Sequence, residues 1–192
     1  MTQNTFSLDF EKRTYGDANL LQQVTVGWRD LPMPVITALH CAVFGGGFQI
    51  MLCADIRIAA PDTKFSIMEA KWGLVPDMGG MALMSELASQ DVVRRLTYTA
   101  EVFDAKQALS WGFVTELDAN SVTRALKLAN QIAVCRPDCI RTSKQLISNT
   151  WIADRAETLL AESVAQKSVL GGYNQMESVL ANFEKRSPIF KD

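Results

Sequence analysis

Three consecutive glycines are the residues of this chain best suited to chemistry. Gly45-Gly46-Gly47 interrupts an uncharged run of twenty residues between Pro34 and Asp55, VITALHCAVFGGGFQIMLCA. The pattern predicts a buried strand that turns into a buried helix, and the first N–H groups of a helix have no partner within it. Such groups bind an anion, or an oxygen that becomes negative during a reaction. The turn is therefore a candidate oxyanion site, although a tight strand-to-helix crossing explains the glycines equally well.

Two carboxylates follow the glycine turn. Glu69 comes after the apolar run FSIM, which predicts a place at a strand end, where α/β proteins bind ligands. A partly desolvated carboxylate near Trp72 would be an effective base near neutral pH, and the alternative is a surface glutamate. Asp77 lies in the loop GLVPDMGG and could face Glu69, an arrangement that suits proton transfer on a carbon skeleton. The alternative for Asp77 is a cap on a helix that starts near Met78.

His40 is the single histidine of the chain. No cysteine stands at ligand spacing from it, so no zinc site is expected, and no metal site is predicted elsewhere. A serine triad is excluded because no GxSxG turn is present. We interpret His40 as a histidine of the core or of a strand end.

The elements that must position these groups follow from the spacing of apolar residues. Pro32 and Pro34 end the first helix, and Gly112 ends a later one. Strands are expected at 35–39, 56–60, 64–68 and 113–117. Helices are expected at 18–31, at 48–54, from a Ser89 cap to 99, from an Asp104 cap to 111, at 121–133, from 137 onward, at 156–170 and at 176–185.

Composition sets the outer limits. The 192 residues, 48% of them hydrophobic, fit one domain or one domain with an appendage. The net charge of −2 and the lack of a basic run argue against nucleic acid as a partner. The uncharged run is long enough to span a membrane, but its glycines and its balanced flanking charges argue against a span. Four cysteines without paired spacing, and no signal peptide, predict buried thiols in a cytoplasmic protein: Cys41, Cys53, Cys135 and Cys139.

Together these residues resemble the crotonase superfamily, the enoyl-CoA hydratase/isomerase fold. The resemblance rests on MPVITALHCAVFGGGFQIMLCADIRIAAPDTKF and MEAKWGLVPDMGG, and it continues through FDAKQALSWGFVTEL, RPDCIRTSK and ESVLANFEKRSPIF. It covers the chain from about Leu20 to the end. It implies an α/β fold with a crotonase-type ββα spiral core, incomplete here, followed by a C-terminal helical oligomerisation region.

The resemblance also implies a site. The family binds acyl-CoA thioesters and holds the thioester carbonyl between two backbone N–H groups, one of which falls on Gly46. Hydratases of the family carry glutamates at the positions of Gln49 and Glu69, and dienoyl-CoA isomerases carry aspartate, glutamate and aspartate at Gln49, Glu69 and Asp77. Glutamine is no general base, although it can hydrogen-bond water or substrate. The implied site is therefore Glu69, Gly46, Asp77 and Gln49, with Glu69 transferring the proton and double-bond isomerisation favoured over hydration.

Three departures from the family pattern qualify this expectation. Residues 1–34 contain neither the first strands nor the AFSAG-like loop that gives the second oxyanion N–H, so the chain is expected to be a fragment or a natural truncation. Gln49 replaces a carboxylate, and Cys41 stands where the family usually has glycine after a strand. Lys144 and Lys185 are candidates for contacts with coenzyme A, and solvated helix faces are the alternative. Coenzyme A is expected only as part of the substrate, with no separate cofactor.

The expected organisation is a polar segment and helix at 1–34, the spiral core at 35–120 and the helical region at 121–192. Missing turns of a spiral would uncover the apolar faces of 35–39 and 56–60, which predicts a homotrimer, a hexamer or a partner fragment. Three function classes remain open. They are an enoyl-CoA hydratase/isomerase-like enzyme, a non-catalytic acyl-CoA binder, and a peptidase-like or dehalogenase-like relative.

Overall fold

The computed structural model describes residues 9–151 and 153–191. By their contacts these residues form two compact units. The first contains the described residues up to Asp30 together with Val35–Val122, and the second contains Leu31–Pro34 together with the described residues from Thr123 onward. The helix expected to precede the core therefore belongs to the same compact unit as the core. The division into segments 1–34, 35–120 and 121–192 stays a prediction.

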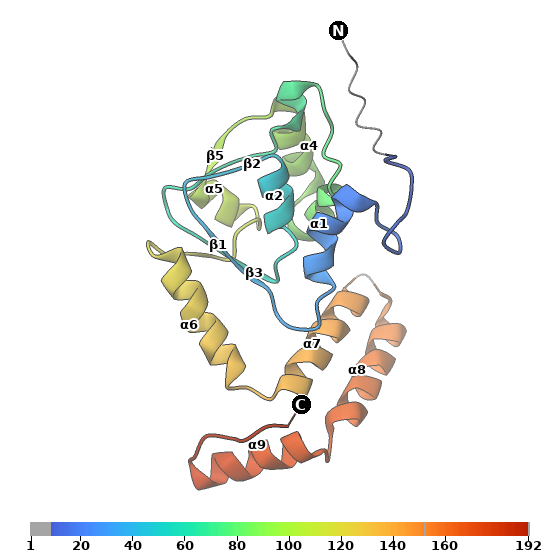
Figure 1. Ribbon diagram of the computed structural model, residues 1–192, viewed down its shortest axis with the longest axis vertical. Coiled ribbons are helices and arrows are strands. Elements are labelled where there is room, and N and C mark those ends of the chain that lie inside the picture. The colour runs from blue at the N-terminus through green and yellow to red at the C-terminus, as the bar shows by residue number, and fades with distance from the viewer. Residues whose placement is uncertain (1–8, 152, 192) are drawn as a thin grey trace. The chain divides into compact units, whose positions relative to one another are not determined.

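Two small sheets organise the first unit (Figure 1), which confirms the α/β class. In the first sheet β1 (Ile36–Leu39), β3 (Ile56–Ala59) and β6 (Glu116–Leu117) are parallel, in the order β1-β3-β6. In the second, β2 (Ala42–Phe44) pairs in parallel with β4 (Lys64–Ser66), and β4 pairs antiparallel with β5 (Phe103–Asp104). Consecutive strands β1 and β2 thus belong to different sheets, joined through His40 and Cys41.

Helices cover these sheets, and two of them begin with a reciprocal cap. Asn19 and Gln22 form a capping box at α1, and Asp104 and Gln107 form one at α5. None of the helices in the described parts of the chain is long and apolar enough to cross a membrane. The helices of this unit are α1 (Leu20–Arg29), α2 (Gly46–Met51), the 3-10 helix η1 (Glu69–Trp72), α3 (Gly80–Leu87), α4 (Gln90–Thr99) and α5 (Ala105–Ser110).

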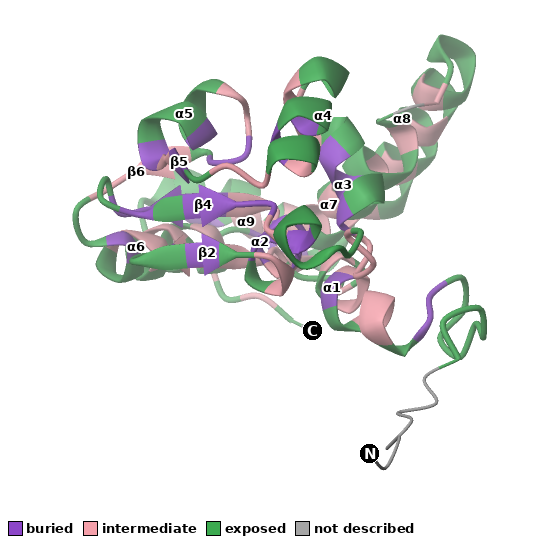
Figure 2. Cartoon of the chain, turned by 90° about the horizontal axis from the view of Figure 1, so that it is seen from above, coloured by how far each residue is buried: buried purple, intermediate pink, exposed green. Residues whose placement is uncertain are grey.

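Four phenylalanines form the centre of the first unit's core. Phe48 of α2 meets Phe65, Phe103 and Phe113 edge-on, with ring centroids 5.2–6.5 Å apart. All four side chains are at most 2% exposed. Figure 2 shows buried residues concentrated on β4, on the middle of β2 and on the helices beside them. Because edge-to-face rings add to the burial energy, this cluster holds α2 firmly against the second sheet.

A buried arginine closes the C-terminal end of α2. The Arg57 side chain, 5% exposed, donates from Nη1 to the carbonyl of Ala54 and from Nε to the carbonyl of Phe113 at 2.8 Å. Burial lowers the pKa of Arg57, and the nearby Arg29 lowers it further. Its donors satisfy carbonyls that would otherwise be buried without partners.

The second unit is helical, as expected, but it has little core of its own. Its helices are α6 (Ser121–Ala133), which begins at the boundary between the units, α7 (Pro137–Thr150), α8 (Arg155–Val169) and α9 (Tyr173–Glu184), and α7 packs on α8 (Figure 1). Among its described residues only Arg136, Asn174 and Ala181 are buried. Large apolar side chains are exposed along α8 and α9: Leu159, Leu160, Val164, Met176, Val179, Leu180 and Phe183.

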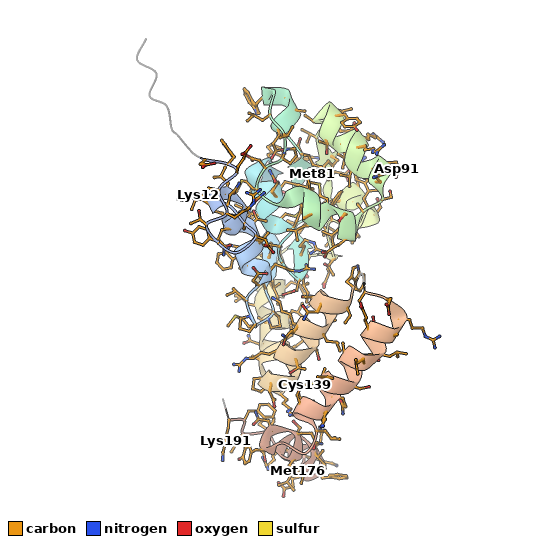
Figure 3. The ribbon with its side chains drawn as sticks, turned by 90° about the vertical axis from the view of Figure 1, so that its right-hand side faces the viewer. Lys12, Met81, Asp91, Cys139, Met176 and Lys191 are labelled. Carbon is orange, nitrogen blue, oxygen red and sulfur yellow. The ribbon has the colours of Figure 1, made fainter. Side chains whose placement is uncertain are left out.

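The C-terminal tail is fastened along α9. Asn174 donates to the carbonyl of Lys191 and accepts from its N–H, each at 2.8 Å, and the Lys191 ammonium lies 4.0 Å from the centroid of the Tyr173 ring. Figure 3 shows Lys191 beside this helix. Glu177 accepts from Arg186 through both carboxylate oxygens and from the N–H of Ile189. Side chains of α9 thus hold the tail through hydrogen bonds and one cation–π contact.

The Glu177 carboxylate gives this unit a pH dependence. Hydrogen bonds from Arg186 and from the N–H of Ile189 lower the pKa of Glu177 from 4.5 to about 2. A carboxylate with a lowered folded-state pKa stabilises above its unfolded value, and this is lost as pH falls from 4.5 toward 2. We expect Glu177→Gln to lower the thermal midpoint of the protein at pH 7 and to have little effect at pH 2. Circular dichroism melts of both proteins measure this, and an equal difference at both pH values would contradict it.

Several expectations about the first strands are wrong. The strand at 35–39 was expected to be buried and to run straight into the glycines, but β1 buries only Leu39 and β2 intervenes before the turn. Strands β2 and β5 were not predicted, because runs of three and two residues carry too little periodicity. His40 is exposed at a strand end, which is one of the two places predicted for it. Of the four cysteines, all free, Cys53 is buried, Cys139 is half-buried, and Cys41 and Cys135 are exposed, which corrects the expectation of buried thiols.

Cys41 occupies a strained position in the turn between β1 and β2. Its φ of 60° lies in the left-handed region, which costs about 1–2 kcal/mol for a residue with a Cβ. Replacing Cys41 with glycine would relieve this strain. Part of the gain in stability would be lost, because glycine has more conformational freedom than cysteine in the unfolded chain. We therefore expect Cys41→Gly to raise the free energy of unfolding by about 0.5–1 kcal/mol. Urea unfolding measures it, and Cys41→Ala, which keeps the Cβ, should show no such gain; a gain of equal size in both variants would contradict strain as the cause.

Candidate active site

The glycine turn connects β2 to α2. Gly45 has φ of 51°, donates its N–H to the Ser66 carbonyl at 3.1 Å and accepts from the Gln49 N–H at 3.0 Å. Gly46 is the first residue of α2, so its N–H has no acceptor within the helix. No backbone hydrogen bond between described residues uses this N–H. The turn thus presents the donor that the sequence predicts, although the strand before it is β2.

The Glu69 carboxylate lies against this turn. A Cβ placed on Gly45 would be 3.8 Å from Glu69 Oε1. Glu69 is the first residue of η1 and is 8% exposed, so the surface alternative is wrong. Oε1 accepts from Gln49 Nε2 at 2.6 Å, whereas Oε2 is buried without a hydrogen-bond partner among the described residues. A buried oxygen without a partner is costly, so this carboxylate is a candidate functional group.

Gln49 links this carboxylate to a distant loop. Its side chain is 1% exposed, and its Oε1 accepts from the N–H of Met78 at 2.9 Å and of Gly80 at 3.1 Å. A Cβ on Gly80 would lie 2.7 Å from Gln49 Cγ, so only glycine leaves room for this contact. In the sequence, only the family resemblance indicated Gln49. A local signal that could also have indicated it is a single uncharged polar residue within an otherwise apolar helix.

Asp77 and Met78 belong to the same loop. Asp77 is half-buried, and within the described chain its carboxylate makes no hydrogen bond with Glu69 or Gln49. It does not cap α3 either, because the N-cap is Gly79 and no side chain caps it. Met78 was missed by sequence reasoning. Its Sδ lies 3.0 Å from the position of a Cβ on Gly46, so the thioether borders the predicted oxyanion donor.

The other candidates lie outside this group. His40 Nδ1 is 3.1 Å from Cys41 Sγ in the exposed turn between β1 and β2. Lys144 and Lys185 belong to the second unit, where Lys144 donates to the Met33 carbonyl and Lys185 is the exposed C-cap of α9. Their contacts with coenzyme A stay predictions.

A glycine turn at a helix start, facing a buried glutamate across a short distance, is the geometry that the crotonase resemblance implies. The family model described as enoyl-CoA hydratase/isomerase matches residues 9–192. The chain belongs to this family, within the crotonase superfamily.

Relatives agree with this assignment. The carnitinyl-CoA dehydratases of Shigella flexneri and Escherichia coli K12 are each 32% identical over 168 residues, which are 84% of this chain and 64% of the relative. The enoyl-CoA hydratase structure from Bacillus anthracis matches 89% of this chain and 67% of its own, with a TM-score of 0.82 and 28% identity. That from Polaromonas sp. JS666 gives a TM-score of 0.80 and 25% identity, over 89% of this chain and 66% of its own. The chain thus spans about 64% of the length of the curated relatives it matches.

Proposed function

We propose that this chain carries the proton-transfer site of an enzyme that acts on enoyl-CoA thioesters. Glu69 moves the proton, and the Gly46 N–H donates to the thioester oxygen as that oxygen becomes enolate-like. The observation that carries the proposal is the buried Oε2 of Glu69, which has no hydrogen-bond partner in the part of the chain that the structure describes and lies beside a glycine turn at a helix start. A preorganised donor aimed at a developing oxyanion is worth about 3 kcal/mol of transition-state stabilisation.

The proposed reaction is double-bond isomerisation. Glu69 takes a proton from C2 of a 3-enoyl thioester, the electrons shift toward the carbonyl oxygen, and the proton returns at C4 to give the 2-enoyl thioester. One carboxylate suffices for this sequence, because the proton that it accepts is the one that it returns. Gln49 adds no second base, and Asp77 is proposed to assist from the loop before α3.

A lyase reaction is the second candidate, because the relatives named above are dehydratases and hydratases. Addition of water at C3 of a 2-enoyl thioester also places negative charge on the thioester oxygen, in the enolate of a 3-hydroxyacyl thioester, but it needs a group that activates water. Gln49→Glu supplies a second carboxylate at the position where hydratases of the family carry glutamate. We expect this variant to raise the rate of hydration of a 2-enoyl-CoA by about tenfold or more. Product analysis with a 2-enoyl-CoA measures that rate separately from isomerisation of a 3-enoyl-CoA, and an unchanged hydration rate would contradict the role given to this position.

The experiment that tests the function is a paired measurement on the full chain. Isomerisation of a 3-enoyl-CoA is followed by the absorbance of the conjugated product, and thermal shift with the same thioester reports binding. Turnover together with binding supports the enzyme. A stabilising shift without turnover would instead support the alternative, a non-catalytic acyl-CoA binder.

The proposed active form is a homotrimer or hexamer with coenzyme A present only as part of the substrate. Support comes from the apolar side chains exposed on α8 and α9, since apolar surface of this extent is typical of interfaces. Gel filtration with light scattering tests the assembly, and a monomer at micromolar concentration would contradict it.

A further inference from the structure

We propose that Gln49 is a positioning residue that holds Glu69 in one orientation and leaves Oε2 as its reactive oxygen. The inference rests on the proposed function, since it concerns which atom of the base meets the substrate. It goes beyond that function because it assigns a role to a residue that is neither acid nor base.

The orientation of the Gln49 amide is fixed by its partners. The N–H groups of Met78 and Gly80 can only donate, so they require the amide oxygen. The amide nitrogen must then face Glu69, and it donates to Oε1 at 2.6 Å. A flipped amide would set a nitrogen against two backbone donors and an oxygen against a carboxylate. The hydrogen-bond partners of Gln49 therefore fix the orientation of its amide, and the amide in turn fixes the position of Glu69 Oε1.

The two oxygens of Glu69 consequently differ. Oε1 accepts a charge-assisted hydrogen bond from the Gln49 amide, so it is already engaged within the protein. Oε2 is buried and lacks a partner among the described residues, so it remains free to accept. A side chain that would otherwise sample several rotamers is thus presented in one geometry, and such preorganisation lowers the barrier to proton transfer.

The same amide couples the base to the loop before α3. Met78 borders Gly46, and its N–H donates to Gln49, which in turn donates to Glu69.

Two substitutions of Gln49 separate its contact with the loop from its contact with Glu69. Gln49→Glu retains an acceptor for the two N–H groups, and its second oxygen, when ionised, replaces the fixed amide donor to Glu69 with a like charge. Gln49→Met removes both functions at similar volume.

The test combines kinetics with a signal that does not need turnover. For isomerisation of a 3-enoyl-CoA, both variants should lower kcat by about 10–100-fold and leave KM within about threefold, because Gln49 acts through Glu69. The ¹³C carboxyl NMR signal of Glu69, assigned by its loss in Glu69→Gln, should be single and sharp in the parent and broadened or split in both variants.

The possible results distinguish the role proposed for Gln49 from the proposed function of the site. Parental kcat in Gln49→Glu with a loss in Gln49→Met would show that Gln49 only anchors the loop, and this would overturn the inference. An unchanged Glu69 signal in both variants would overturn it as well. Parental turnover in Glu69→Gln would reject the proposed function instead, and the carboxyl signal would still decide whether Gln49 orders Glu69.

Discussion

Replacing Glu69 with glutamine is expected to lower kcat for isomerisation of a 3-enoyl-CoA by about 10²–10⁴-fold, the usual contribution of a positioned general base. The amide oxygen of the new side chain can still accept from Gln49 Nε2, so the local hydrogen bond survives. Its NH₂ group replaces Oε2 and cannot take a proton. The rate of formation of the conjugated thioester measures the effect.

The fold should be unaffected by this change. A buried carboxylate oxygen without a partner destabilises the protein, so Glu69→Gln should have a thermal midpoint equal to or above that of the parent. Asp77→Asn is the control variant for Glu69→Gln. The Asp77 carboxylate lies in the loop before α3, and it has no hydrogen bond to Glu69 or Gln49 within the described residues. We expect it to cost less than tenfold in kcat, as befits an assisting group. Turnover of Glu69→Gln within threefold of the parent would remove Glu69 from the mechanism.

The sequence indicates where the site groups lie along the chain, but it does not indicate how they meet. Two local patterns correctly indicated residues that meet in the candidate site. They are the glycines before an apolar helix and the glutamate after an apolar run. The contact between Gln49 and Glu69 spans twenty residues, and those between Gln49 and the Met78 and Gly80 amides span 29 and 31. The parallel pairing of β2 with β4 brings Glu69 close to Gln49, and the loop before α3 brings the Met78 and Gly80 amides to the same side chain; no local pattern encodes either approach.

Element boundaries show the same division. The helix from 121 to 133 is confirmed at both ends, and Ser89 and Asp104 are the N-cap residues of α4 and α5 as expected, although only the Asp104 side chain accepts a capping hydrogen bond. These boundaries follow from the spacing of apolar residues and from the polar residue at the start of each helix. The predicted strand at 64–68 instead ends at Ser66, since the helix η1 begins at Glu69. The predicted strand at 113–117 is shorter in the structure and contains only Glu116–Leu117. Strand ends are set by the partner strand, which a single segment does not specify.

The largest loss of stability is expected from Gly112→Ala. Gly112 follows the C-cap of α5 with φ of 89°, and a Cβ there would lie 2.2 Å from the backbone oxygen of Leu87 at the end of α3. A backbone atom cannot rotate aside, so α3 and the turn must move apart. The buried Phe113 follows directly and would be displaced from the aromatic core. Backbone strain of about 1–2 kcal/mol and overpacking of about 1–3 kcal/mol together predict a loss of about 3 kcal/mol in the free energy of unfolding.

Gly16→Ala separates the two contributions. Gly16 also has a positive φ, 60°, but a Cβ there would have no atom within 4 Å. This variant therefore carries the backbone strain alone and should lose only about 1 kcal/mol. Urea unfolding followed by tryptophan fluorescence measures both, since Trp111 adjoins Gly112 and packs on Phe103. Equal losses in the two variants would mean that the contact with Leu87 relaxes freely, and the junction of α3 with α5 would then not be a rigid part of the core.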